Sequence, residues 1–475
     1  MTSPANTRLP ISDDVEAVLP AAISRAHNWL KSTADEEDKA TEQLADLLRD
    51  EDGVKFTMDF VDRVMRPEDD KVAAHALKDI SSHYDPSFLG SINGALVGAG
   101  GFFGPILPNL VMPITRIYMR KMVGHLVLDA ESESLNKTLD KAAESGEQLN
   151  LNLLGEAVLG EAEAKSRAER TLKLIQNPRV TYVSVKASSM VAQLNQWDID
   201  GSVERLKERL RPLYEEAARR NPQVFINMDM EEYHDLHLTI RLFKELMSEP
   251  EFKNLESGIV LQAYLPDTFD ALKDIAEFAK KRVAEGGAKV KVRIVKGANL
   301  SMETVQGEVH DWPLATYTNK LDVDANYYRL LDFILREEYA DSVRIGVATH
   351  NLYTAAMAYE LGKKRGVLHM MDSEMLQGMS PAQQAAVRKV FDGRQILYTP
   401  VVHAEDFDVA VSYLVRRLEE NSAPQNFLYA LFAPGEEPLA DQEETFRRAV
   451  AKRWDTFAGA RRTQNLSLIH ISEPT

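Results

Sequence analysis

The stretch GIVLQAYLPDTFDALKDIAEFAKKRVAEGGAKVKVRIVKG, residues 258–297, contains the unit from which the fold of this chain can be predicted. Its two ends are short runs rich in β-branched residues, and DALKDIAEFAKKRVAEG between them has apolar residues at helical spacing. A strand, a helix and a second strand in succession predict a βαβ unit, in which the two strands are parallel.

The same alternation extends in both directions along the chain. The β-rich runs are LNLNLLG (149–155), VTYVSVKAS (180–188), VFINMDM (224–230), GIVLQAYL (258–265), VKVRIVKG (290–297), VRIGVATH (343–350), VLHMMDSEML (367–376) and QILYTPVV (395–402). Eight such units predict an α/β fold, a closed (β/α)8 barrel of the TIM type over residues 151–430. The connection after the fifth run, residues 297–325, is longer than a plain loop and is interpreted as a functional insertion.

The segments on either side of the barrel differ from it in pattern. Residues 1–150 show helical spacing, so we expect an all-helical N-terminal arm. Within it, the Gly-rich residues 90–110 are similar to a dinucleotide-binding fingerprint, but Pro105 and Pro108 follow the glycines, which favours a helix break or packing loop. Residues 431–475 are expected to form a C-terminal helix or linker, ending in a non-native tail, TQNLSLIHISEPT, on a truncated chain.

Composition excludes several classes of protein. The 475 residues are 44% hydrophobic, and 56 Lys and Arg against 73 Asp and Glu give a net charge of −17, which argues against a nucleic-acid-binding surface. The absence of cysteine excludes disulfides, thiolate nucleophiles and cysteine-ligated metals. The N-terminus does not have the pattern of a signal peptide and no apolar run is long enough to span a membrane, so we expect a cytoplasmic location.

Polar side chains gather at the predicted strand ends, where chemistry takes place in such barrels. They are Lys186, Asp229, Gln262, Arg293, Lys296, His350, Asn351 and Tyr398. Each one alone has a structural explanation: a lysine can reach solvent from a strand end, an aspartate can cap a helix and a histidine can be a satisfied core residue. Together on one rim they indicate a ligand site.

The stretch YLVRRLEEN, residues 413–421, carries two adjacent arginines on a helix whose other face is apolar. One interpretation is a solvated face with Arg–Glu pairs at helical spacing. The other is a guanidinium fork for a ligand carboxylate. With the polar rim in mind, we expect this helix to lie over the barrel mouth, where Arg416 and Arg417 meet a small carboxylate and Lys186 adds a third positive charge.

In combination, VSVKAS, NMDMEE, VLQAYL, VRIVKGA, VATHN, EMLQGM, YTPV and YLVRRLEEN resemble proline dehydrogenases, specifically the flavin-dependent barrel of the bifunctional proline utilization A family. The resemblance implies a distorted barrel with its eighth helix over the mouth. It implies FAD-dependent oxidation of L-proline to Δ1-pyrroline-5-carboxylate by hydride transfer to flavin N5, the first step of proline catabolism to glutamate. It also implies a membrane quinone as acceptor, with transient peripheral contact to a membrane, and a following aldehyde dehydrogenase domain that this chain does not contain.

The resemblance also assigns roles to residues. Arg416, Arg417 and Lys186 hold the proline carboxylate. Asp229, Tyr398, Tyr413 and Leu376 line the proline ring, and Asn299 stands beside it. Contacts to FAD are assigned to Gln262, Arg293, Lys296, Gly297, Ala298, Thr318, Lys320, Thr349, His350, Asn351 and Glu420. Among these, Arg293 is our candidate for favouring the anionic reduced flavin.

The sequence departs from the family pattern in three motifs. KGA is followed by Asn299 and Leu300 in place of Tyr-Trp, Glu374 stands in place of Gln, and Thr318-Asn319-Lys320 replaces Thr-Arg-Lys. Asn and Leu have less volume than Tyr and Trp, so we expect a roomier substrate pocket on that side.

Other barrel functions remain open at this stage. Lys186 or Lys296 could form a Schiff base as in class I aldolases, or His350, His403 and Asp229 could bind a metal. A non-catalytic scaffold that works through its helical arm is a third possibility. Only the flavoprotein is expected to be yellow.

Overall fold

The computed structural model describes residues 14–33, 51–65, 67, 69–84, 100–123, 126–130, 132–155, 158, 160–195, 197–403, 410, 413, 417, 420–421, 423–433 and 435–462. Eight parallel strands form a closed barrel: β2 (Gln148–Leu153), β3 (Tyr182–Lys186), β4 (Phe225–Asp229), β5 (Ser257–Gln262), β6 (Val290–Val295), β7 (Val343–Ala348), β8 (Met371–Leu376) and β9 (Gln395–Val402). Each pairs with the next, and β9 pairs with β2 to close the sheet. The predicted barrel is thus confirmed.

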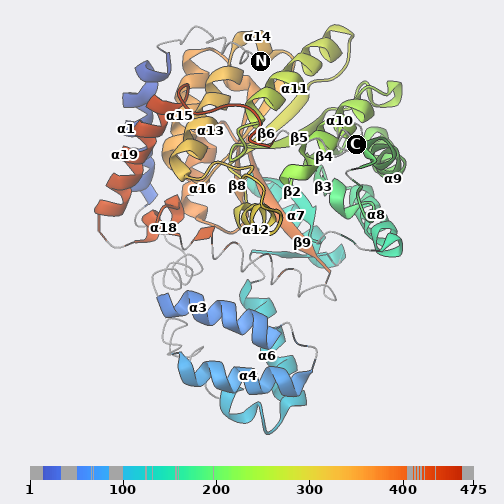
Figure 1. The fold of residues 1–475 in the computed structure, drawn as a ribbon, viewed down its shortest axis with the longest axis vertical. Helices are drawn as coiled ribbons and strands as arrows, with labels where there is room; N and C mark the ends of the chain where they lie inside the picture. Colours follow the sequence, from blue (N-terminus) through green and yellow to red (C-terminus); the bar gives the residue numbers. More distant parts are fainter. Residues whose placement is uncertain are drawn as a thin grey trace, which may run out of the picture.

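Helices surround the strands (Figure 1). Their bounds are α7 (Ser132–Ser145), α8 (Glu161–Gln176), α9 (Ile199–Arg219), α10 (Leu236–Met247), α11 (Thr268–Ala284), α13 (Lys320–Ile334), α14 (Glu337–Ala340), α15 (Leu352–Lys364) and α16 (Pro381–Val390). Along each strand, side chains that point into the barrel alternate with side chains that point outward. The outward side chains are mostly apolar and face these helices. On β6, Val290, Val292 and Ile294 belong to the main apolar core, which explains why the strands read as β-rich runs.

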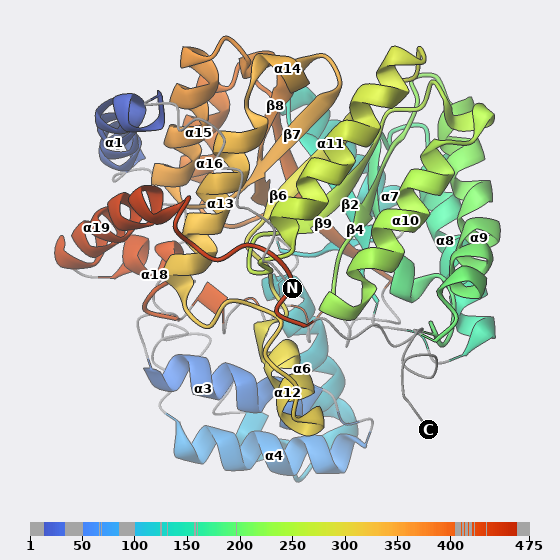
Figure 2. The same cartoon turned by 45° about the horizontal axis from the view of Figure 1, so that its top comes forward.

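The long connection after β6 contains a helix of its own, α12 (Leu300–His310). Figures 1 and 2 show α12 outside the ring of helices, on the side of the barrel where the separate helical arm lies. Its Glu303 is buried and accepts a hydrogen bond from the backbone N–H of Tyr233 at 2.6 Å. That contact fastens α12 to the segment after β4, so the insertion is anchored at the mouth of the barrel.

The N-terminal helices divide into two groups. Helix α1 (Asp14–Thr33) packs against α15 and joins the main core. In contrast, α3 (Glu51–Phe60), the π-helix Val61–Met65, α4 (Asp70–His83) and α6 (Pro108–Val123) build a separate apolar cluster. In the described part of the Gly-rich stretch, a helical turn ends near Gly104 before α6 begins, which confirms the predicted helix break there.

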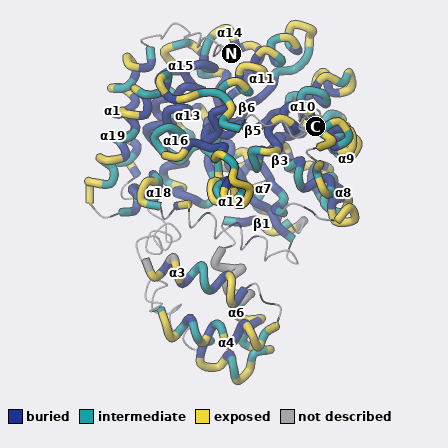
Figure 3. Tube along the Cα trace, in the orientation of Figure 1, coloured by how far each residue is buried: buried dark blue, intermediate teal, exposed yellow. Residues whose placement is uncertain are grey.

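After the barrel, α18 (Phe427–Phe432) and α19 (Glu437–Lys452) return along its side. Helix α19 packs against α13, and an ion pair from Arg453, directly after α19, to Glu16 of α1 at 2.7 Å connects this region to the N-terminal helix. Figure 3 shows the buried residues concentrated in the barrel, with exposed ones along α12 and the arm. The tail of residues 463–475 lies outside the described residues.

Candidate functional site

The interior of the barrel is polar at its carboxyl end. Alternate strands contribute Asn152 (β2), Asp229 (β4), Arg293 (β6) and Glu374 (β8), all buried. Side chains at alternate positions of a strand share one face, and in a closed barrel the side chains of alternate strands fill one layer. Hydrogen bonds join Asn152 to Asp229 and Arg293 to Glu374, so this layer forms a hydrogen-bonded floor under the barrel mouth.

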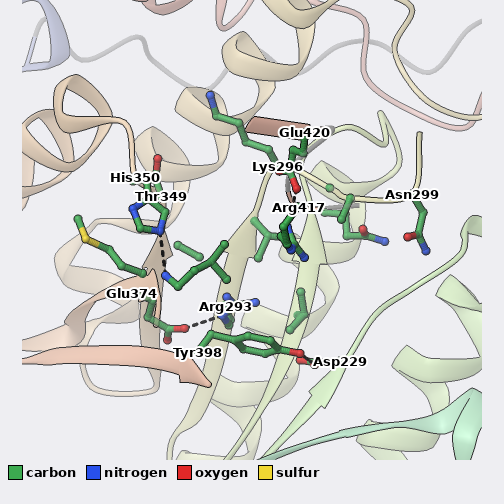
Figure 4. A pocket seen from close by; sticks show the side chains of 18 of the residues that line it. Asp229, Arg293, Lys296, Asn299, Thr349, His350, Glu374, Tyr398, Arg417 and Glu420 are labelled. Carbon is green, nitrogen blue, oxygen red and sulfur yellow. Dashed lines mark hydrogen bonds and ion pairs between the residues drawn. The ribbon is translucent and has the colours of Figure 1, made fainter. Parts of the chain in front are cut away.

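Above this floor is a cavity of about 280 Å3. The predicted site residues that line it are Lys186, Asp229, Gln262, Arg293, Lys296, Gly297, Ala298, Asn299, Lys320, Thr349, His350, Asn351, Leu376, Tyr398, Tyr413, Arg417 and Glu420. Thr318 is not among its lining residues, and Arg416 lies outside the described residues. Figure 4 shows Asn299 on the opposite side of this pocket from Glu374 and His350.

One group of side chains surrounds the Asp229 carboxylate. The Tyr398 hydroxyl donates to Oδ2 at 2.8 Å and the Asn227 amide donates to Oδ1 at 2.7 Å, while the Asn152 amide contacts both Asp229 and Tyr398. Burial raises the pKa of Asp229, although the Arg293 guanidinium and Tyr398 act in the opposite direction. Burial and the Asp229 carboxylate raise the pKa of Tyr398 well above its ordinary value, so its hydroxyl remains a donor.

Arg417 belongs to the stretch 413–421, and it has features of both the solvated-face and the ligand-binding interpretation of that stretch. It lines the cavity, its guanidinium carbon lies 5.2 Å from the centre of the Tyr413 ring, and it pairs with Glu420 at 2.5 Å. Burial would lower the pKa of Arg417, but Tyr413 and Glu420 outweigh it and raise that pKa. Within the described residues its Nε has no hydrogen-bond partner. The Arg417 side chain is 20% exposed, and a part-buried guanidinium with an unused Nε donor at a cavity is suited to an anionic ligand.

Lys186 lies at the end of β3, lines the cavity and pairs with Glu231. The second oxygen of Glu231 accepts from Ser188 at 2.7 Å, and its backbone carbonyl accepts from Gln262 at 2.9 Å. Glu231 therefore ties the ends of three consecutive strands together.

At the rim, Lys296, Lys320 and Asp324 form a second charged group, which we name the rim cluster. Asp324 Oδ1 lies 2.5 Å from Lys296 Nζ, and its other oxygen contacts Lys320. Burial, followed by the neighbouring Lys296 charge, lowers the pKa of Lys320 to about 8. Burial would raise the pKa of Asp324, but the two lysines outweigh it and lower that pKa. Two cations thus share one carboxylate next to the cavity.

His350 is held as a neutral imidazole. Its Nε2 accepts a hydrogen bond from the backbone N–H of Leu376 at 2.9 Å, which places the ring proton on Nδ1, 3.3 Å from Ser380 Oγ. Burial and then the Arg417 charge lower the pKa of His350 to about 4. In the described ranges no group of three or more His, Asp or Glu side chains is arranged to hold a metal ion, so the metal alternative gains no support.

Beneath the cavity, Lys291, Arg293 and Glu374 form what we name the floor cluster. Glu374 Oε2 lies 2.5 Å from Arg293 Nε, and Oε1 lies 2.6 Å from Lys291 Nζ (the Arg293 pair is drawn in Figure 4). The Arg293 guanidinium carbon lies 4.9 Å from the centre of the Tyr398 ring. Arg293 is therefore held from below by a carboxylate and from the side by an aromatic face.

Sequence reasoning missed several of these residues. They are Asn152, Glu231, Lys291 and Asp324; Glu374 was noted only as a departure from a family pattern. A signal existed for two of them, since Asn152 and Lys291 are polar residues within otherwise apolar strands. Glu231 and Asp324 gave none, because each lies on a segment where charged residues are common.

The comparisons with known proteins agree with one another. A family profile described as "Proline dehydrogenase" matches residues 135–430. The bifunctional protein PutA of Klebsiella aerogenes is 28% identical over 374 residues, which cover 74% of this chain and 27% of that protein. The solved PutA structure from Corynebacterium freiburgense is 58% identical, with a TM-score of 0.67 over 74% of this chain and 35% of that one.

A second solved structure extends the likeness beyond the barrel. PutA from Bdellovibrio bacteriovorus, inactivated by N-propargylglycine, is 27% identical, with a TM-score of 0.73 over 90% of this chain and 44% of that one. The chain therefore spans between a quarter and a half of the length of these three proteins.

Proposed function

The chain belongs to the proline dehydrogenase family, and on this premise we propose that it oxidises L-proline to Δ1-pyrroline-5-carboxylate with FAD as its cofactor. The observation that carries this proposal is the cavity itself. It lies at the carboxyl ends of the barrel strands and brings a part-buried Arg417, the Asp229–Tyr398 pair and the charged floor and rim clusters to one ligand-sized space.

The residues present fit a flavin dinucleotide. The lining of the cavity includes five cationic side chains in an otherwise acidic chain, which suits the anionic diphosphate: Lys186, Arg293, Lys296, Lys320 and Arg417. Gly297 has a φ of +124°, and a Cβ there would lie 2.5 Å from the Tyr264 ring, so the loop after β6 needs glycine. We assign the diphosphate to the rim cluster and the ring system to the region of Arg293, Gln262 and His350. When bound, FAD supplies the two-electron acceptor of the oxidation.

The substrate carboxylate is assigned to Arg417, with Lys186 as a second positive charge and Arg416 as the second guanidinium. Arg417 is part-buried, and its Nε has no hydrogen-bond partner within the described part of the chain, so an incoming carboxylate gains a charge-assisted bond at this atom. The main contribution of such a clamp is to hold the reacting carbon in one orientation.

The remaining walls of the substrate space are assigned to Asp229, Tyr398, Tyr413 and Leu376. Tyr398 and two amides hold the Asp229 carboxylate in one position, so the wall is rigid before a ligand enters. His350 is neutral at physiological pH, since its pKa is about 4, and therefore adds no positive charge. In this arrangement Arg293 supplies the positive charge that the floor presents to the cavity. That charge would stabilise the negative charge that the flavin gains on reduction.

The electron acceptor and the place of action complete the proposal. We assign reoxidation to a membrane quinone, reached from the cytoplasm by transient contact with the membrane surface. No helix within the described residues has the length and apolar character needed to cross a bilayer.

The test is an anaerobic titration of the purified chain after loading with FAD. A yellow protein whose flavin absorbance is bleached by L-proline, with Δ1-pyrroline-5-carboxylate as product, is the expected result. Flavin-loaded protein whose spectrum does not change at saturating proline contradicts the proposed activity. A protein that takes up no flavin contradicts the cofactor assignment.

A further inference from the structure

The floor cluster contains a charged pair that the proposed reaction does not use. Glu374 lies between Lys291 and Arg293, with one carboxylate oxygen toward each. The exposed fractions of the side chains are 0% for Lys291, 0% for Glu374 and 10% for Arg293. Of these three residues, Arg293 and Glu374 line the cavity and Lys291 does not, so Lys291 acts on the site from beneath it.

The backbone leaves space for this pair. Lys291 and Arg293 are two residues apart on β6 and so share its inward face. Glu374 approaches from β8 across Gly346 of β7. A Cβ at Gly346 would lie 2.2 Å from Glu374 Oε1 and 3.1 Å from Lys291 Cε. The glycine is therefore what allows the carboxylate and the ammonium group to meet in the middle of the barrel.

Further charges continue the cluster away from the cavity. Lys291 also lies 2.9 Å from Asp372, Asp372 lies 2.7 Å from Arg344, and Arg344 lies 2.9 Å from Glu256. Three cations therefore face three carboxylates along this line. Replacing Glu374 by a neutral residue leaves one uncompensated positive charge, and replacing Lys291 leaves one uncompensated negative charge.

The burial of the pair determines how far its charges act. Lys291 meets Glu374 and Asp372 as close ion pairs, at 2.6 and 2.9 Å. Salt and water screen buried charges much less than exposed ones. Glu374 therefore offsets the charge of Arg293, and Lys291 offsets that of Glu374. Without Glu374 the cavity floor is therefore more positive than in the wild type, and without Lys291 it is more negative.

We propose that Lys291 and Glu374 are positioning residues, which hold the Arg293 guanidinium at the cavity floor and set how strongly its charge favours the reduced cofactor. This inference rests on the proposed flavin chemistry. Reduction adds negative charge to the flavin, so a more positive floor raises the reduction potential and a more negative floor lowers it.

The experiment is a measurement of the flavin reduction potential against a redox dye in four variants with matched flavin occupancy. Glu374→Gln should raise the equilibrium ratio of reduced to oxidised flavin at least tenfold, which corresponds to about 30 mV for a two-electron couple. Lys291→Met should lower the ratio by a similar factor. The double variant should return to within about threefold of the wild type, since both charges are then absent.

Glu256→Gln is the matched control, because it removes a carboxylate from the far, part-exposed end of the same line of charges. Its ratio should stay within about threefold of the wild type. If the variants lose thermal stability while the potential stays constant, the pair is merely structural and the inference is overturned. Should Glu374→Gln fail to fold, Lys291→Met and the double variant still test the opposite shift and its reversal. A wild type that binds no flavin contradicts the proposed function instead.

Discussion

The floor cluster and the rim cluster have the same number of charges of each sign, but they differ in how far they are exposed to solvent. In each, two cationic side chains share one carboxylate: Lys291, Arg293 and Glu374 in the floor cluster, and Lys296, Lys320 and Asp324 in the rim cluster. The floor cations are 0% and 10% exposed, whereas the rim lysines are 28% and 26% exposed.

The difference in exposure indicates that the charges of the two clusters have different roles. In the floor, charges cannot turn toward water, so their number and position are fixed by one another. At the rim, the lysines retain contact with solvent, and the pKa of Lys320 is lowered to about 8, within reach of ordinary conditions. The floor is therefore suited to a constant field, and the rim to an exchangeable anionic ligand.

The largest expected effect tests the floor. Glu374→Ala removes the shared carboxylate and should lower the free energy of unfolding by about 3–5 kcal/mol, because two buried cations lose their partner. Asp324→Ala makes the same change at the rim and should cost less, about 1–3 kcal/mol, because its lysines can turn toward water. Urea denaturation of the two variants without cofactor measures both values. Equal losses would show that exposure does not distinguish the clusters.

Arg417 extends the comparison to a third position, since its side chain borders the cavity and is 20% exposed, between the floor and the rim cations. Arg417→Met should weaken proline binding by about 2–5 kcal/mol, because the substrate carboxylate loses a desolvated charged donor. Flavin content should fall much less. Steady-state KM for proline and the absorbance ratio of flavin to protein provide the two readouts. A wild-type KM would assign Arg417 to the solvated-face interpretation, with Glu420 as its partner.

The rim should also respond to pH where the floor does not. Lys320 is charged below its pKa of about 8, so affinity for the anionic cofactor should fall as the pH rises through that value, by at most about tenfold per pH unit. Lys320→Arg should remove this dependence, since arginine stays charged. Fluorescence titrations of FAD at pH 7, 8 and 9 provide the measurement. An identical slope in both proteins would assign the pH dependence to another group.

Linkage gives an independent check on the same group. The folded pKa of Lys320 is lower than the ordinary value of 10.5, so between about pH 8 and 10.5 the unfolded chain holds more protons. The cofactor-free protein should therefore gain stability from this residue as the pH rises through that window. Thermal melts of wild type and Lys320→Met measure this gain, since the difference between their melting temperatures should change across the range. A difference that stays constant with pH would show that the assignment is wrong.

How much of this could be predicted from the sequence depends on the range of the interaction. The eight strands were predicted because each is a local pattern, and their ends gave most of the cavity lining because parallel strands present their carboxyl ends at one face. The pairing of Arg293 with Glu374 joins residues 81 positions apart and depends on the register across β7. Likewise, the spacing of α1 predicts an apolar face but not its partner, which is α15.

The smallest expected effect concerns the side of the pocket opposite the floor cluster's Glu374, where Asn299 lies (Figure 4). Asn299 lines the cavity, whereas Leu300 is 50% exposed and is not among its lining residues. We expected positions 299 and 300 together to shape this wall of the substrate pocket. In the structure the wall depends on Asn299 and not on Leu300. Asn299 stands before α12 without making a side-chain cap, so replacing its side chain should disturb the helix little.

We therefore expect measurable turnover of the six-membered analogue pipecolate by the wild type, because the roomier side of the pocket accepts one more methylene. Asn299→Tyr should lower kcat/KM for pipecolate relative to that for proline. The expected decrease corresponds to about 1–3 kcal/mol of transition-state binding, the usual limit for discriminating one methylene. Leu300→Trp is the matched control and should leave that ratio unchanged, since Leu300 is half exposed and is not among the residues that line the cavity. The ratio of the two kcat/KM values in the three proteins is the measurement. If Asn299→Tyr leaves the ratio unchanged, another residue already closes this wall, and the substrate space is limited by the Asp229–Tyr398 side instead.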